Sequence, residues 1–127
     1  MAQSNAYRVI YVTCPNRGDA LRIGRFLVQQ RLVASANVVP SMTAVYWWEG
    51  KLREGEESIL IAKTRAALAE RVVAAVKDQH EFDVPCIIVL PILGGARAYL
   101  DWIAEQTRER VRPAPTMELV NEPYLEA

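Results

Sequence analysis

The chain has 127 residues, with 15 basic and 15 acidic side chains and two cysteines. This length suits one domain with its own core, and a balanced charge without a Lys/Arg run argues against a nucleic-acid partner. Two cysteines are too few for a secreted disulfide scaffold, no apolar run approaches the roughly 20 residues that span a bilayer, and the first residues lack a signal-peptide pattern. We therefore expect a cytoplasmic protein with neither a membrane nor a nucleic acid as partner.

The first elements are a strand and a helix. Residues 7–13 are β-branched and aromatic, which predicts a central strand that ends before Pro15. Asn16 is typical of a helix N-cap, and apolar residues recur at helical spacing over residues 20–28. The pattern predicts a helix that runs to about Leu32.

A long hairpin is expected next. Residues 33–48 have strand character, interrupted by a kink at Pro40–Ser41, because proline is confined to edges or bulges of sheets. Residues 49–57 carry charges and two glycines, which predicts a polar tip, and residues 58–63 are expected to pair back. Such a hairpin forms an arm that reaches beyond the domain body.

The second half of the chain predicts helix, strand and helix. Thr64 is expected to cap a helix that ends near His80, and residues 84–92 read as a fourth strand. Gly94–Gly95 breaks this strand, and residues 96–110 predict a third helix. A glycine pair before a helix is only weak evidence for an anion site.

The element order is β-α-β-β-α-β followed by a helix, which predicts an α+β fold of the ferredoxin-like, split βαβ type (βαββαβ) with an antiparallel sheet and an extended β-hairpin. We expect a flexible segment over residues 1–6, the domain over residues 7–110 and a proline-containing tail over residues 111–127. Within the tail, residues 116–120 are a candidate for a short added strand. Two helices cover only one face of such a sheet, so association is expected to cover the other.

Three consecutive aromatic residues, Tyr46, Trp47 and Trp48, stand near the end of the long strand. Alternate side chains of a strand point to opposite faces, so Tyr46 and Trp48 point one way and Trp47 the other. An aromatic block on both faces is typical of an oligomer interface, because Trp and Tyr are enriched in interface cores. The alternative is that these rings stack on a ligand.

One end of the predicted sheet gathers Cys14, Cys86 and His80, the only histidine. Two thiols and an imidazole suit soft metals such as Cu(I), or Zn(II). The alternative is that both cysteines are small core residues and the histidine a capping residue, since no Cys-x-x-Cys spacing is present. Three carboxylates are expected to supplement the site weakly: Glu81, Asp83 and, from another subunit, Glu49.

Five segments of the chain have an unusual sequence and follow one another in unbroken order. They are Val12-Thr13-Cys14-Pro15, residues 32–40, Thr43 to Lys51, His80-Glu81-Phe82-Asp83-Val84-Pro85 and Leu90-Pro91-Ile92. Together they resemble the CutA divalent-cation tolerance family, over about residues 7–105. The resemblance implies a ferredoxin-like fold, a tight homotrimer, a topology like that of the PII signalling proteins, and a link to copper tolerance. The chain departs from the common family pattern His-Pro-Tyr-Glu-x-Pro-Glu after its histidine.

Two functions remain open at this stage. The first is a homotrimer that acts in the response to divalent metal ions such as copper, by weak metal binding or by scaffolding. The sequence establishes no cofactor for it, and copper or another divalent metal ion is the candidate. The second is a PII-like signalling module that binds a small anionic metabolite at clefts between subunits, lined by Arg17, Lys51 and Arg53. No nucleophile elbow, Walker-A loop or dinucleotide fingerprint is present, so an enzyme is not expected.

Overall fold

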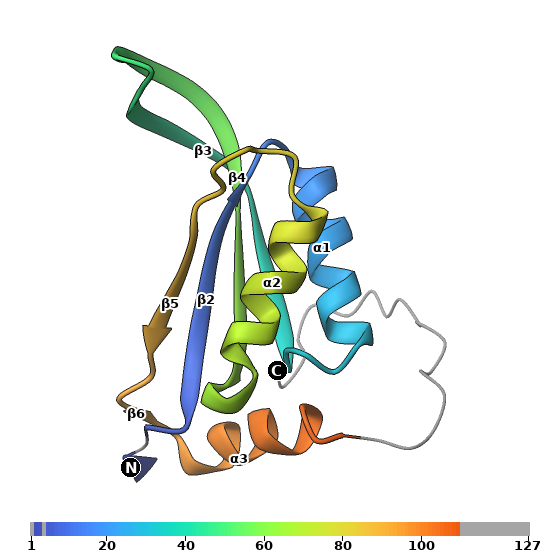
Figure 1. Cartoon of the computed structure of the whole chain (residues 1–127). Helices are drawn as coiled ribbons and strands as arrows, with labels where there is room; N and C mark the ends of the chain where they lie inside the picture. Colours follow the sequence, from blue (N-terminus) through green and yellow to red (C-terminus); the bar gives the residue numbers. More distant parts are fainter. Residues whose placement is uncertain (1, 4, 110–127) are drawn as a thin grey trace.

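A computed structural model describes residues 2–3 and 5–109 of the chain (Figure 1). A four-stranded sheet carries two helices on one face, and a third helix lies across one end of the sheet. The elements are, in chain order, β1 (Ala2–Gln3), β2 (Tyr7–Cys14), α1 (Arg17–Gln29), β3 (Ser35–Trp48), β4 (Lys51–Arg65), the 3₁₀ turn η1 (Ala66–Leu68), α2 (Ala69–Gln79), β5 (Ile87–Pro91), β6 (Gly94–Gly95) and α3 (Arg97–Gln106).

The strand order is β3-β4-β2-β5, and every neighbouring pair is antiparallel. The two strands joined by the hairpin lie on one side of the sheet, and the fourth strand returns to pair with the first. This is the order that two βαβ crossovers of the same hand produce. The predicted α+β, ferredoxin-like fold is therefore confirmed.

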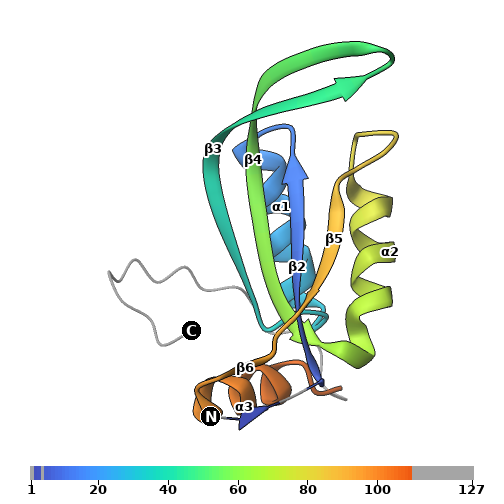
Figure 2. The same ribbon diagram turned by 90° about the vertical axis from the view of Figure 1, so that its left-hand side faces the viewer.

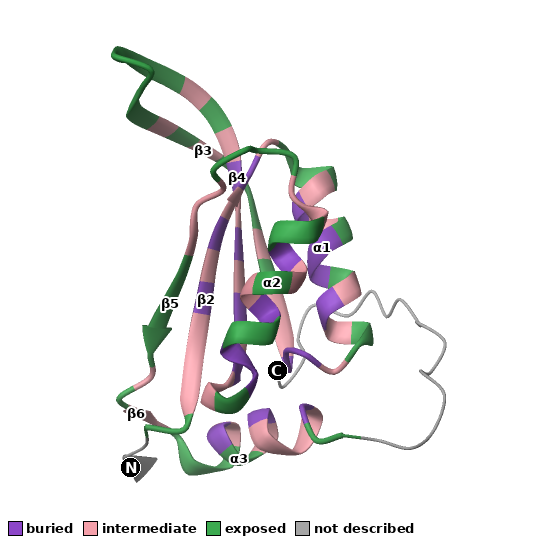
Figure 3. Cartoon of the chain, viewed as in Figure 1, coloured by how far each residue is buried: buried purple, intermediate pink, exposed green. Residues whose placement is uncertain are grey.

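The core lies between the sheet and helices α1 and α2. Alternate residues of the two central strands face these helices and are fully buried, among them Ile10 and Val12 of β2 and Leu60 of β4. The opposite face of the sheet carries the intervening residues, and neither α1 nor α2 covers it (Figure 2). The burial colouring shows the same asymmetry, with exposed residues along β5 and over the hairpin arm (Figure 3).

The first helix begins where the sequence predicts, because the Asn16 side chain accepts a hydrogen bond from the Asp19 backbone N–H at 2.8 Å. Its end was predicted too late. The helix stops at Gln29 instead of Leu32, since Arg31 adopts a left-handed backbone with φ of 59°. A non-glycine residue in this region ends a right-handed helix.

The hairpin is longer and tighter than expected. Glu49 and Gly50 both have positive φ, 52° and 76°, which is the backbone of a two-residue hairpin turn. β4 therefore starts at Lys51, and the predicted polar tip over residues 49–57 was wrong. Apart from Glu49 in the turn, the charged residues of this segment belong to β4, and all of them except the half-buried Glu57 are exposed. The predicted kink is confirmed, since the register between β3 and β4 shifts between Val39 and Met42.

Two buried hydroxyls tie β4 to the chain beside it. Ser58 Oγ donates to the Pro40 carbonyl at 2.6 Å, at the register shift, and Thr64 Oγ1 donates to the Leu32 carbonyl at 2.6 Å. Thr64 is thus the end of a strand rather than the predicted helix cap. The 3₁₀ turn η1 separates it from α2, which ends at Gln79, close to the predicted end at His80.

The last long strand and the last helix are shorter than predicted. β5 covers residues 87–91 of the expected 84–92, and α3 covers residues 97–106 of the expected 96–110. Gly94–Gly95 does more than interrupt a strand, because it pairs with Ala2–Gln3 from the segment that we expected to be flexible. The predicted strand at residues 116–120 and the tail that contains it lie outside the described residues.

Two arginines anchor the end of α3. Arg31 donates to the carbonyl and side-chain oxygens of Gln106, and Arg65 donates to the hydroxyl and carbonyl oxygens of Thr107. Cations at a helix C-terminus are stabilised by the helix dipole. A small second core of Ala34, Leu100 and Ile103 is enclosed beneath the helix. No helix among residues 2–3 and 5–109 has the length and hydrophobicity that crossing a membrane requires.

Candidate functional site

A cleft of about 570 Å³ opens where the hairpin arm leaves the body of the domain. One wall is the arm, the floor is the end of β2, and the other wall is the loop between α2 and β5. A volume of this size suits a small-molecule ligand. Its lining residues are Thr13, Ala44, Tyr46, Trp48, Arg53, Glu57, Glu81, Phe82, Asp83, Val84 and Cys86.

Strand alternation decides which aromatic residues reach the cleft. Tyr46 is paired with Arg53 across the hairpin, and both line the cleft together with Trp48. Trp47 is paired with Leu52, and neither lines it. The aromatic block is therefore divided between the two faces of the arm, as the period of two predicts.

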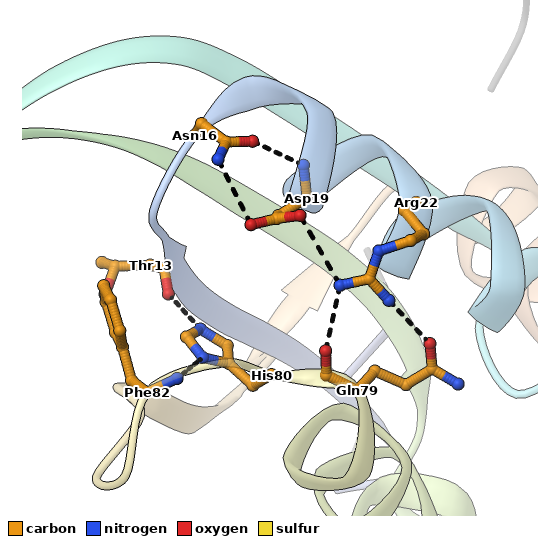
Figure 4. Close-up of polar contacts among 7 residues, drawn as sticks. All are labelled: Thr13, Asn16, Asp19, Arg22, Gln79, His80 and Phe82. Atoms are coloured by element: carbon orange, nitrogen blue, oxygen red, sulfur yellow. Dashed lines mark hydrogen bonds and ion pairs between the residues drawn. The ribbon is translucent and has the colours of Figure 1, made fainter.

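His80 fixes the loop that forms the far wall of the cleft (Figure 4). Its Nε2 lies 2.7 Å from the carbonyl oxygen of Thr13, and its Nδ1 lies 3.1 Å from the backbone nitrogen of Phe82. A carbonyl only accepts and a backbone N–H only donates, so Nε2 carries the proton and Nδ1 accepts. Both ring nitrogens of a neutral imidazole are thus used in holding the loop against β2.

A polar chain beside His80 joins the two helices (Figure 4). Asp19 lies 3.7 Å from an Arg22 guanidinium nitrogen, and Arg22 donates to the carbonyl and side-chain oxygens of Gln79 at 3.0 Å each. Arg22 thereby satisfies a carbonyl at the C-terminus of α2, where the helix dipole favours a cation. The start of α1 and the end of α2, from which His80 projects, are held together by these bonds.

Cys14 lies on the helix side of the sheet and belongs to the main core. Its side chain is fully buried, and burial, followed by the nearby charge of Asp19, raises the pKa of the thiol from 9.0 to about 11. A thiol with this pKa stays protonated at neutral pH. Cys14 is thus held as a thiol rather than the thiolate that binds metal.

Cys86 lies on the opposite face. The Thr13 backbone N–H donates to the Cys86 carbonyl at 3.2 Å, next to the pair Val12–Ile87, so the register places Cys86 opposite Thr13. Residues opposite each other share a face, and the residue that follows Thr13 points the other way. Cys86 lines the cleft with Thr13, whereas Cys14 does not.

The three residues of the predicted metal site therefore meet at one end of the sheet, as expected, without sharing one donor set. Cys14 faces the core, Cys86 faces the cleft, and both nitrogens of His80 bond to backbone groups. Across the described part of the chain, no three or more His, Cys, Asp or Glu side chains are grouped so that they could hold a metal ion.

Three carboxylates and one guanidinium line the cleft. Glu57 comes from β4, and Glu81 and Asp83 come from the loop, whereas Arg53 is the one basic residue in the lining. Arg53 is itself 3.9 Å from Glu49 at the tip of the arm. The other basic residues expected at an anion site, Arg17 and Lys51, do not line this cleft.

Sequence reasoning missed the cleft as a unit, although most of its residues lie in segments that it singled out. Ala44, Tyr46 and Trp48 are spaced by two, and so are alternate residues of β4 that include Arg53 and Glu57. This spacing places them on one face of the arm. A polar tip over residues 49–57 hid the signal, because it removed half of β4 from the predicted strand.

Comparison with known proteins gives a consistent result. The chain is 45% identical over 101 residues to the chloroplastic protein CutA 1 of Oryza sativa, which covers 80% of this chain and 57% of the relative. It is 39% identical over 99 residues to the divalent-cation tolerance protein CutA of Thermus thermophilus, covering 78% of this chain and 96% of the relative. The chain thus spans about half the length of its plant relatives and nearly all of the bacterial one.

Comparison with solved structures gives the same result as comparison with known sequences. The crystal structure of CutA1 from Oryza sativa superposes with a TM-score of 0.79 at 41% identity, covering 86% of this chain and all of that one. The structure of the periplasmic divalent cation tolerance protein CutA from Archaeoglobus fulgidus gives a TM-score of 0.78 at 35% identity, covering 80% of this chain and 99% of that one. The family described as CutA1 divalent ion tolerance protein matches residues 8–106, and the chain belongs to this family.

Proposed function

We propose that this chain acts as a homotrimer in the tolerance of divalent metal ions such as copper, by weak metal binding or by scaffolding, and without catalysing a reaction. Family membership supports the tolerance role. The structural observations that carry the assembly are the exposed apolar residues of β5, on the sheet face that neither α1 nor α2 covers, together with the apolar face of the arm. The proposed location is the cytoplasm, although the rice relative is named chloroplastic and the Archaeoglobus fulgidus protein periplasmic.

Two apolar surfaces support self-association. On the body, β5 exposes 46% of Ile88 and 45% of Leu90. On the arm, Val45, Trp47 and Leu52 are 60%, 72% and 62% exposed. Exposed apolar surface of this extent marks an interaction site.

The positions of these surfaces favour a ring. They lie on different parts of one subunit, the arm and the sheet, so one surface of a subunit is available to contact a different surface of the next. Contacts between unlike surfaces generate closed rings when the rotation closes, and a trimer is one of the common closed forms. Of the three aromatic residues expected at the interface, Trp47 lies on the more exposed face of the arm and supports a contact with a neighbour, while Tyr46 and Trp48 line the cleft.

The metal part of the proposal rests on the charge of the cleft. Cys86, Glu57, Glu81 and Asp83 offer one thiol and three carboxylates against a single guanidinium. This lining attracts cations and disfavours the anionic metabolite of the PII-like alternative. The absence of a grouped donor set among the described residues is the reason for proposing weak binding. Cys14 and His80 enter this site only if the end of the sheet rearranges.

Sedimentation equilibrium at micromolar concentration tests the assembly. The unchanged chain is expected to sediment as a trimer, and Trp47→Asp to dissociate it, because the variant would bury an unpaired charge in the contact. Trp47→Phe is the matched control and is expected to remain trimeric. A monomeric unchanged chain would defeat the proposal.

Calorimetry with copper and zinc tests the metal part. Cys86→Ser is expected to weaken binding more than Cys14→Ser, because only Cys86 reaches the cleft. Binding should fall as the pH drops and the ligands take up protons. Equal copper binding by the variant that lacks both thiols would remove the thiols from the proposal.

A further inference from the structure

The lining of the cleft has a second property besides its negative charge, which is three aromatic side chains on its two walls. Tyr46 and Trp48 belong to the arm, Phe82 belongs to the facing loop, and each keeps about two fifths of its surface exposed: 42%, 39% and 39%. Aromatic faces on opposite walls suit a ligand that carries a positive charge on an apolar body.

We infer that the cleft binds an organic ammonium ion, a cation with an apolar body, between these aromatic rings and the three carboxylates. The inference goes beyond the role in metal tolerance and does not depend on it. A tightly bound metal ion requires several donor atoms that converge on one point, and the described residues form no such group, so only weak metal binding is proposed for the cleft. An organic cation requires only a negative field and aromatic faces, and both are present.

The charge of the cleft selects the sign of the ligand. Glu57, Glu81 and Asp83 outnumber Arg53, so an anion would meet net repulsion. The volume of about 570 Å³ accommodates an aryl or branched alkyl ammonium ion. Fixed wall positions favour binding, because His80 already holds the Phe82 backbone at 3.1 Å and little ordering is needed.

A second copy of the chain is the competing occupant, and the distribution of charge argues against it. An apolar segment of a neighbour in this cleft would bury three carboxylates beside one guanidinium, and burying unpaired charge is costly. The opposite face of the arm, with Val45, Trp47 and Leu52, is the more exposed and more apolar surface. The two faces of the arm thus suit different partners: the face with Val45, Trp47 and Leu52 suits a neighbouring subunit, and the face that lines the cleft suits a cationic ligand.

The experiment titrates the unchanged 127-residue chain with benzyltrimethylammonium and follows binding by calorimetry. Benzyl alcohol and benzoate carry the same ring with a neutral and a negative group, and both are expected to bind more weakly. Phe82→Leu keeps an apolar side chain without a ring and is expected to weaken binding about threefold or more, while Phe82→Tyr restores it. Added salt is expected to reduce the affinity, because the carboxylates act partly through space.

A pair of matched charge variants locates the effect. Glu57→Gln removes a carboxylate from the cleft, whereas Glu54→Gln removes an exposed carboxylate of the same strand that does not line it. Glu57→Gln should weaken binding and Glu54→Gln should leave it unchanged. Equal binding of the ammonium ion and the alcohol, an equal effect of both variants, or no binding of the ammonium ion by the intact chain would each overturn the inference. A trimer in sedimentation would leave the proposed assembly standing in any of these cases.

Discussion

The buried thiol of Cys14 makes a quantitative prediction about stability in alkaline solution. Its pKa is about 11 in the folded chain and 9.0 in the ordinary exposed state, because burial disfavours the thiolate. Between these two values the unfolded chain releases the thiol proton and the folded chain retains it. Rising pH therefore favours unfolding, and the stabilisation present below pH 9 is lost as the pH passes through about 11.

The size of the loss follows from the shift in pKa. A difference of about two pKa units corresponds to roughly 3 kcal/mol of unfolding free energy, at about 1.36 kcal/mol for each unit. Other groups also titrate in this range, so the measurement must isolate Cys14. Cys14→Ala provides the reference, because it removes the thiol and leaves the other titrating groups in place.

The assay is urea unfolding of both proteins at pH 8, 9, 10 and 11, followed by tryptophan fluorescence at one fixed protein concentration, since an oligomer's stability depends on concentration. The difference in unfolding free energy between the unchanged chain and Cys14→Ala should be constant up to about pH 8 and then shrink by about 2 kcal/mol by pH 11, where about half of the folded chains have lost the thiol proton. A difference between the two proteins that stays the same from pH 8 to pH 11 would refute the reasoning.

Three further predictions concern packing and access. A thiol reagent at pH 8 should label Cys86 in the folded chain and Cys14 only after unfolding, as mass spectrometry of tryptic peptides would reveal; labelling of Cys14 in the native chain would contradict its burial. Gly24→Ala should lower the unfolding free energy by about 1 kcal/mol, because the new Cβ would lie 3.1 Å from Ala36 Cβ and 3.2 Å from Leu60 Cδ1. The double variant Gly24→Ala with Ala36→Gly should restore stability. A melting temperature that Gly24→Ala alone leaves unchanged would contradict the close contact. Arg65→Met should speed amide hydrogen exchange in α3, because it removes two hydrogen bonds to Thr107. The control Arg108→Met removes an exposed ion pair to Glu105 and should not change the exchange. Equal exchange in both variants would show that Arg65 does not anchor the helix.

The order of the elements and the fold could be predicted from the sequence, because apolar periodicity and turn residues report directly on strands and helices. Asn16 is an N-cap whose signal is local, and it was predicted correctly. Thr64 has the same cap chemistry, but its hydroxyl bonds to the Leu32 carbonyl, which lies 32 residues earlier on the far side of the β3–β4 hairpin, and this tertiary bond leaves no local trace. The charged strand after Gly50 was mistaken for a loop, because an arm with two exposed faces lacks the apolar alternation of a half-buried strand.

The candidate site, too, could be predicted from the sequence only in part. That Cys14, Cys86 and His80 lie near one end of the sheet followed from the topology. That the cysteines point to opposite faces follows from the register, in which Cys86 lies opposite Thr13, and register is set by pairing that a single sequence does not display. The use of both His80 nitrogens depends on the path of the loop after α2, which no periodic pattern describes.

The two hydroxyls of β4 have a consequence for how the sheet selects one alignment. A slip of two residues between β3 and β4 keeps every side chain on its own face, so the division between core and solvent cannot reject it. Such a slip would move Ser58 away from the Pro40 carbonyl and Thr64 away from the Leu32 carbonyl, and leave two buried hydroxyls without acceptors. Ser58, at the middle of β4, and Thr64, near its end, therefore make a single alignment of the hairpin the favoured one.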